Sequence, residues 1–160
     1  MSRFLLFLFV VLFFSDCKEK TKYTFFDYHT FENNTWNSEE KITFEFNIKD
    51  SISNFSKEIH IRHNSDYKYQ NILLFVHQTS PDNRTNIDTI NILLSDEISG
   101  KWIGQGETDI REHLFVLKEK TKLKKGTHLL VFEIAMRYGN IPELKSILNI
   151  SEIGFSVKKL

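Results

Sequence analysis

Six histidines are the residues of this chain whose type most suggests chemistry, because a neutral imidazole readily binds metal ions. His60 and His63 are three residues apart in an alternating segment that predicts a strand. Side chains at this spacing point to opposite faces of a strand, so the pair is poorly placed to share one ion. The other four are isolated in the sequence: His29, His77, His113 and His128. We therefore predict no metal site and interpret the histidines as solvated or turn residues.

Catalytic and nucleotide-binding motifs are absent from the sequence. It contains neither Gly-x-Ser-x-Gly nor a phosphate loop of the type Gly-x-x-x-x-Gly-Lys-Ser. Glu107 and Asp109 could pair as carboxylates, but a glycosidase needs two such groups at a defined separation in a cleft. We predict no catalytic residue and no cofactor.

Two tryptophans are candidates for contact with a ligand or a partner. Trp36 and Trp102 both lie in loop-like segments, where an exposed indole can stack on a sugar or anchor a protein partner. The alternative is that each ring plugs an end of the fold. Trp102 belongs to the segment 100–106, which holds three of the six glycines. Such glycines predict unusual backbone angles or the close approach of another chain segment.

The start of the chain has the pattern of an export signal. Arg3 precedes eleven consecutive apolar residues, too few to cross a bilayer that needs about 20 residues in helical form. Cys17 follows them and is the only cysteine, so it has no internal disulfide partner. A plain signal peptide beside a chance cysteine, or a short buried helix, would also fit this pattern.

The position of Cys17 resembles the lipobox of bacterial lipoproteins, where cleavage leaves the cysteine as the first, acylated residue. Asp16 departs from that pattern, because Gly, Ala or Ser is usual there. The resemblance implies a signal peptide at 1–16, a tether at 17–22 and lipid attachment at Cys17. Lys18 stands where Asp is the usual signal for retention in the inner membrane, so it implies sorting to the outer membrane.

Composition predicts a single charge-balanced domain at 23–160. Removing 16 of the 160 residues leaves 144, about the size of one ordinary domain. Basic and acidic residues number 21 each, so no basic surplus points to nucleic acid. Plentiful aromatic residues supply apolar material for a core.

Alternating apolar residues predict most of the strands. The segment 41–49 alternates strictly, which places one face on a core and the other in water. The run 72–76 is apolar on both faces and predicts a central strand, which the turn residues at 80–83 join to the next run as a hairpin. Further strands are expected at 23–28, 57–63, 86–94, 113–117, 127–137 and 151–158.

Three segments are less regular. We expect a loop at 29–40, a solvated edge strand in the lysine-rich segment 118–125, and one short helix near 142–149 that begins at Pro142. About eight strands joined by polar turns, without a sustained helical period, predict an all-β fold. We expect an antiparallel β-sandwich of the jelly-roll type.

The order of several short motifs resembles the GldH family of gliding-motility lipoproteins. The motifs are Phe31-Glu32-Asn33-Asn34-Thr35-Trp36 before 42–46, Arg62-His63-Asn64-Ser65-Asp66-Tyr67 before 71–76, Asp88-Thr89-Ile90, 100–106 with Asp109-Ile110, and Ala135-Met136-Arg137 ahead of Ile153-Gly154-Phe155. The resemblance implies an accessory, non-enzymatic lipoprotein of the gliding machinery, which is coupled to type IX secretion, with protein partners there. It carries over Cys17 as the acylated residue and no catalytic residue.

Two other functions remain open from the sequence. Trp102 motivates a carbohydrate- or peptide-binding module on a lipoprotein, whereas a glycan hydrolase would need a cleft with converging carboxylates. For an anchored lipoprotein, the tether residues Lys18-Glu19-Lys20 contain one acid and poorly match acid-rich surface-export signals. We therefore expect the domain to face the periplasm.

Overall fold

A computed structural model describes residues 23–106 and 109–160. The proposed signal peptide, Cys17 and the tether lie outside these ranges. Within them, no helix is long and apolar enough to span a membrane.

Strands make up nearly all of the regular structure between Tyr23 and Lys159. They are β1 (Tyr23–Thr30), β2 (Thr35–Asn37), β3 (Ile42–Ile48), β4 (Phe55–Asn64), β5 (Asn71–Thr79), β6 (Thr85–Leu93), β7 (Ile110–Thr121), β8 (Gly126–Ile134), β9 (Ser146–Leu148) and β10 (Ile150–Lys159). A 3-10 turn, η2 (Glu32–Asn34), precedes β2. The prediction of an all-β fold is confirmed.

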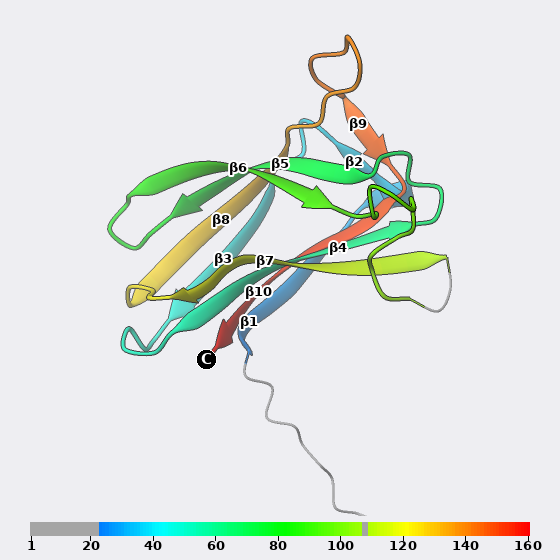
Figure 1. Ribbon diagram of the computed structural model, residues 1–160. Helices are drawn as coiled ribbons and strands as arrows, with labels where there is room; N and C mark the ends of the chain where they lie inside the picture. Colours follow the sequence, from blue (N-terminus) through cyan, green and yellow to red (C-terminus); the bar gives the residue numbers. More distant parts are fainter. Residues whose placement is uncertain (1–22, 107–108) are drawn as a thin grey trace, which may run out of the picture.

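Two four-stranded antiparallel sheets and a short two-stranded ribbon form the sandwich (Figure 1). Sheet A has the order β1-β10-β4-β7, sheet C has the order β3-β8-β5-β6, and the ribbon pairs β2 with β9. The pairs β5–β6, β4–β7, β3–β8, β2–β9 and β1–β10 are nested within one another along the chain. Such nesting is a long hairpin rolled into two layers, which is the jelly-roll arrangement.

The core lies between the inner faces of the two sheets. The strict alternation of β3 buries Ile42, Phe44, Phe46 and Ile48 and leaves the residues between them exposed, as predicted. β5 lies between β8 and β6, so the prediction of a central strand is also confirmed. Burial of each large apolar side chain stabilises the fold by about 1.5–3 kcal/mol.

The predicted helix near 142–149 is wrong. Ser146–Leu148 instead forms β9, which pairs with β2 and places Ile147 opposite Trp36. The apolar residues Leu144, Ile147 and Ile150 have a helix-like spacing, but all three are buried against the sandwich. Pairing in extended form satisfies the backbone of this segment, which an isolated helical turn could not do as well.

The expected loop at 29–40 is only partly correct. β1 continues to Thr30, and the segment also holds η2 and β2. The lysine-rich segment 118–125 does begin as part of β7, and β7 is an edge strand of sheet A, as expected.

Candidate functional site

The outer face of sheet A carries a connected set of polar side chains that we call the outer network. Alternation along the strands directs these residues away from the core, and the register places Arg62 between Glu152 and Glu112. The outer network comprises Tyr28, Glu58, His60, Arg62, Glu112, Glu152 and Ser156.

Arg62 is the centre of one half of the outer network. Its guanidinium donates to Glu152, and its Nε donates to Glu112 Oε2 at 3.0 Å. The same guanidinium lies 4.5 Å from the centre of the Tyr28 ring, a cation–π arrangement. Tyr28 in turn donates its hydroxyl to Glu112 Oε1 at 2.9 Å. One cation is therefore shared by two carboxylates that come from the two strands flanking β4.

These contacts shift the pKa values of the groups involved. Partial burial alone would raise the pKa of Glu112, but the hydrogen bonds from Tyr28 and Arg62 hold it below its ordinary value. Burial, together with the bond to Glu112, raises the pKa of Tyr28. Glu112 is thus an anion and Tyr28 a neutral donor near neutral pH.

His60 and Ser156 form the other half. His60 Nε2 lies 3.0 Å from Ser156 Oγ, and His60 Nδ1 lies 3.4 Å from Glu112 Oε1. Ser156 Oγ can also donate to Glu58 Oε2, at 3.2 Å. Burial holds the pKa of His60 below its ordinary value, although Glu112 opposes this shift. The imidazole is therefore neutral near neutral pH.

A serine, a histidine and a carboxylate in this order could suggest a hydrolase, but their surroundings do not suit one. Ser156 has no exposed surface, and the rings of Phe26 and Tyr28 lie 5.1 and 5.7 Å from the His60 ring. A substrate carbonyl cannot reach the hydroxyl in this arrangement. The converging carboxylates Glu112 and Glu152 are both paired with Arg62, so neither is a free acid or base.

The outer network was missed in the sequence analysis. The sequence does contain one indication of the outer network. Glu58, His60 and Arg62 occupy alternate positions of one strand, which places all three on the same, polar face. The partners of Arg62 are Glu112 and Glu152, which lie 50 and 90 positions away in the sequence. The register that brings their strands beside Arg62 cannot be read from one sequence.

The interpretation of the histidines as solvated or turn residues is wrong for three of the six, which lie buried in strands β4 and β8. His60, His63 and His128 are buried. His60 and His63 do lie on opposite faces of β4: His60 contacts Phe26, and His63 contacts Trp102 on the core side at 4.5 Å between ring centres. In the described ranges, no group of three or more His, Cys, Asp and Glu side chains could hold a metal ion.

Trp36 is a buried core residue and offers no surface to a partner. Its ring is fully buried and stacks on Phe31 at 4.9 Å, and its Nε1 donates to the carbonyl of Glu40 at 2.9 Å. A ring with no exposed surface cannot contact a partner, so the alternative weighed for Trp36 holds. Trp102 is partly buried, against His63 and Tyr67, and its contact role stays a prediction.

The glycine-rich segment 103–106, which we call the arm, lies along the first part of β7. Gln105 and Glu112 exchange two backbone hydrogen bonds of 2.8 Å. A Cβ atom on Gly104 would lie 2.6 Å from the Glu112 carbonyl oxygen, and one on Gly106 would lie 2.1 Å from that of Ile110. The predicted close approach is confirmed. Glu107 lies outside the described residues, so the suggested pairing with Asp109 cannot be followed there.

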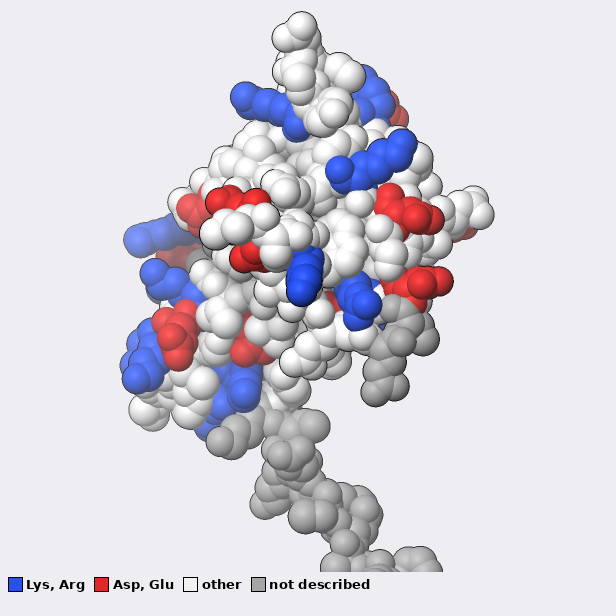
Figure 2. All heavy atoms as spheres, turned by 45° about the vertical axis from the view of Figure 1, so that its right-hand side comes forward, with Lys and Arg blue, Asp and Glu red and all other residues white. Residues whose placement is uncertain are grey.

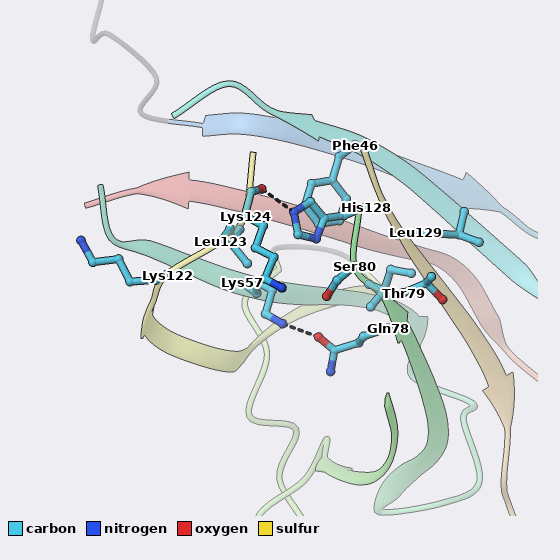
Figure 3. Close-up of a pocket in the computed structure, with 11 residues that line it drawn as sticks. Phe46, Lys57, Gln78, Thr79, Ser80, Lys122, Leu123, Lys124, His128 and Leu129 are labelled. Carbon is cyan, nitrogen blue, oxygen red and sulfur yellow. Dashed lines mark hydrogen bonds between the residues drawn. The ribbon is translucent and has the colours of Figure 1, made fainter. Parts of the chain in front are cut away.

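A small hollow opens at the end of the sandwich nearest Lys124 (Figure 3). It measures about 160 Å³, and His128 stacks on Phe46 beside it at 5.2 Å. Lys57 points into this region and donates to Gln78.

On the face drawn in Figure 2, acidic and basic side chains are interspersed.

The strand order and the paired polar groups define this protein as a jelly-roll β-sandwich with a closed, hydrogen-bonded outer face. The sequence model of the GldH lipoprotein family matches residues 23–157, and the chain belongs to this family.

Two relatives resemble nearly the whole chain. The gliding motility lipoprotein GldH homolog of Christiangramia forsetii is 28% identical over 96% of this chain and 93% of its own. Gliding motility lipoprotein GldH of Flavobacterium johnsoniae is 26% identical over 97% of this chain and 94% of its own. Among solved structures, a carbohydrate-binding module specific for non-crystalline cellulose is 9% identical with a TM-score of 0.43, covering 78% of this chain and 72% of that one. That likeness is too low to transfer a ligand.

Proposed function

We propose that this protein is a non-enzymatic accessory component of a gliding motility machinery linked to type IX secretion. The observation that carries the proposal is membership of the GldH lipoprotein family across residues 23–157. Two relatives that match nearly the full chain are named gliding motility lipoproteins. The burial of Ser156 and the pairing of Glu112 and Glu152 with Arg62 favour a binding role over a catalytic one.

The proposal includes an outer-membrane anchor at Cys17. Residues 1–16 would be removed as a signal peptide, 17–22 would form the tether, and the sandwich at 23–160 would face the periplasm. Each buried methylene of an acyl chain contributes about 0.8 kcal/mol, so several chains on one cysteine hold a protein firmly.

A strain that lacks this gene, complemented with either the natural chain or Cys17→Ala, tests the proposal. The natural chain should restore gliding and remain in the outer-membrane fraction until detergent is added. Cys17→Ala should be recovered without detergent and should not restore gliding. A deletion strain that still glides and secretes normally would remove the proposed function. A membrane-bound Cys17→Ala protein would remove only the anchor.

Glycan binding is the second candidate, because aromatic rings flank the outer network. Phe26 is 49% exposed and stacks on Tyr23 at 5.1 Å, close to the polar groups of His60 and Tyr28. An exposed ring beside hydrogen-bonding groups is suited to the apolar face and hydroxyls of a sugar. A glycan array with the natural chain and Phe26→Ala tests this candidate, which fails if neither protein binds or both bind equally.

A further inference from the structure

Within residues 23–106 and 109–160, the outer edge of β7 is only partly covered by other segments. Glu112 directs its backbone N–H and C=O away from β4, toward the arm. The pairing of β7 with β4 keeps its register from Ile110 to Val116, so the backbone groups of Leu114 and Val116 point the same way as those of Glu112. Beyond Val116 the register shifts. A short stretch of edge therefore continues from the end of the arm to this irregularity.

This stretch is apolar on both faces. Leu114 and Val116 are each 46% exposed on the outer face, while Phe115 and Leu117 pack against the core on the other. An exposed apolar edge is the kind of surface to which another chain adds a strand. The lysines that protect sheet edges begin only at Lys118. The arm demonstrates that this edge accepts a pairing segment.

Two hollows lie at the two ends of the uncovered edge. One, of about 520 Å³, is lined by the arm together with Glu112, His113 and Leu114. The other, of about 350 Å³, is lined by residues that include Lys57, Arg84, Asp88, Lys118 and Thr121. A segment laid along the edge would have a hollow for a side chain at each end.

The second hollow carries a surplus of positive charge. Lys57 and Lys118 face a single carboxylate of the lining, that of Asp88. Arg84 also lines this hollow, but it is paired with Asp82 at 3.0 Å. Burial holds the pKa of Lys57 below its ordinary value; the Asp88 carboxylate opposes this shift, and the nearby Lys118 ammonium adds to it. Lys118 has no ion-pair partner within the described ranges. An incoming carboxylate would relieve this repulsion.

We propose that the edge of β7 at Leu114–Val116 binds an extended segment of a protein partner, with apolar residues at alternate positions and an acidic group that reaches Lys118. This inference rests on the proposed function, since it gives the docking subunit its docking surface. The other edge strand on this side, β6, also exposes an apolar residue, Ile87, but it carries Asp88 where the edge of β7 has only apolar side chains from Leu114 to Leu117. In Figure 1, β7 lies at the rim of sheet A opposite β1.

The test uses the full acylated chain in detergent micelles and a fluorescein-labelled peptide of alternating threonine and valine that ends in two glutamates. Val116→Pro removes a backbone donor that points away from β4, a position where an edge strand tolerates proline. Val116→Thr is the matched control, because it keeps the donor and the side-chain shape. We expect Val116→Pro to weaken binding by about tenfold or more and Val116→Thr to leave it within about twofold.

A second variant keeps the test valid if Val116→Pro does not fold, as judged by circular dichroism. Lys118→Glu should weaken binding of this peptide and strengthen binding of the same peptide ending in two lysines. The inference would be overturned if the natural chain did not bind the peptide. It would also be overturned if the affinity were unchanged in Lys118→Glu and, where that variant folds, in Val116→Pro. A concentration-dependent dimer that is lost in Val116→Pro would overturn it as well, because a second copy would then occupy the edge.

A gliding assay separates this inference from the function on which it rests. If a deletion strain does not glide and Val116→Thr restores gliding, the proposed function stands. Val116→Pro, present in equal amount, should then fail to restore it. Full rescue by a folded Val116→Pro would overturn the edge inference alone.

Discussion

At the scale of single residues, Arg62 has the largest electrostatic role on the outer face. It neutralises Glu112 and Glu152, which are held close together by the register of three strands. Arg62→Met should lower the free energy of unfolding by about 1–2 kcal/mol, less than for a fully buried pair because Arg62 is partly exposed. Urea unfolding measures the change. Adding Glu152→Gln should recover part of the loss.

The matched control for Arg62 is the ion pair of Lys41 with Glu133 on sheet C, where the Lys41 side chain is 61% exposed. Lys41→Met should cost less than about 0.5 kcal/mol. Equal losses for the two variants would mean that the outer network does not depend on its cation.

Three buried or half-buried histidines give the fold a pH dependence. Burial lowers the pKa of His60, His63 and His113 in the folded protein. Because the unfolded chain then binds more protons, stability is present above the unfolded pKa of about 6.5 and is lost as the pH falls below it. We expect the free energy of unfolding to fall between about pH 7.5 and 5.5, a window in which most carboxylates do not yet titrate.

His63 separates this effect from a general loss of stability. Its Nδ1 bonds the Asn64 carbonyl at 3.0 Å, while its buried Nε2 has no hydrogen-bond partner within the described chain. His63→Phe keeps a ring beside Trp102 and should flatten the pH dependence, whatever its effect at pH 7.5. An unchanged slope would show that His63 titrates equally in the folded and unfolded states.

At the scale of elements, the sequence predicts best where one strand's own pattern decides its structure. The alternation of β3 and the apolar run of β5 depend on which faces are buried, and both were predicted. β2 and β9 were missed because each is three residues long and is defined only by its partner. The spacing of Leu144, Ile147 and Ile150 suits a helix equally well, and pairing with β2 decided against it.

The arm is an element whose glycines can be tested individually. Gly104→Ala would place a Cβ atom 2.6 Å from the Glu112 carbonyl oxygen, so the two backbone bonds of Gln105 cannot both persist. We expect hydrogen exchange at the Gln105 and Glu112 amides to accelerate by about tenfold or more. Gly100→Asn is the control, since Gly100 has open space and a φ of +67° that Asn tolerates. Unchanged exchange in Gly104→Ala would mean that the arm is held by other contacts.

At the scale of the whole molecule, the nested pairing makes the last strand as important as the first. β10 lies between β1 and β4, so the four-stranded sheet A is complete only when the end of the chain is in place. The two sheets are then joined by aromatic rings. Phe155 of β10 lies within 5.5–6.4 Å of the rings of Phe25, Phe44, Phe46 and Phe132, measured between ring centres. These partners come from both sheets.

Phe155 should therefore be among the most costly residues to truncate. It is fully buried, and replacing such a ring by alanine leaves a cavity between the layers, so Phe155→Ala should cost about 3–5 kcal/mol. Because whole domains are stable by only about 5–15 kcal/mol, thermal unfolding should shift strongly downward. Phe26→Ala removes an equally large but half-exposed ring from the outer face and should cost about 1 kcal/mol or less. Similar melting temperatures for the two variants would mean that the rings between the sheets do not hold the layers together.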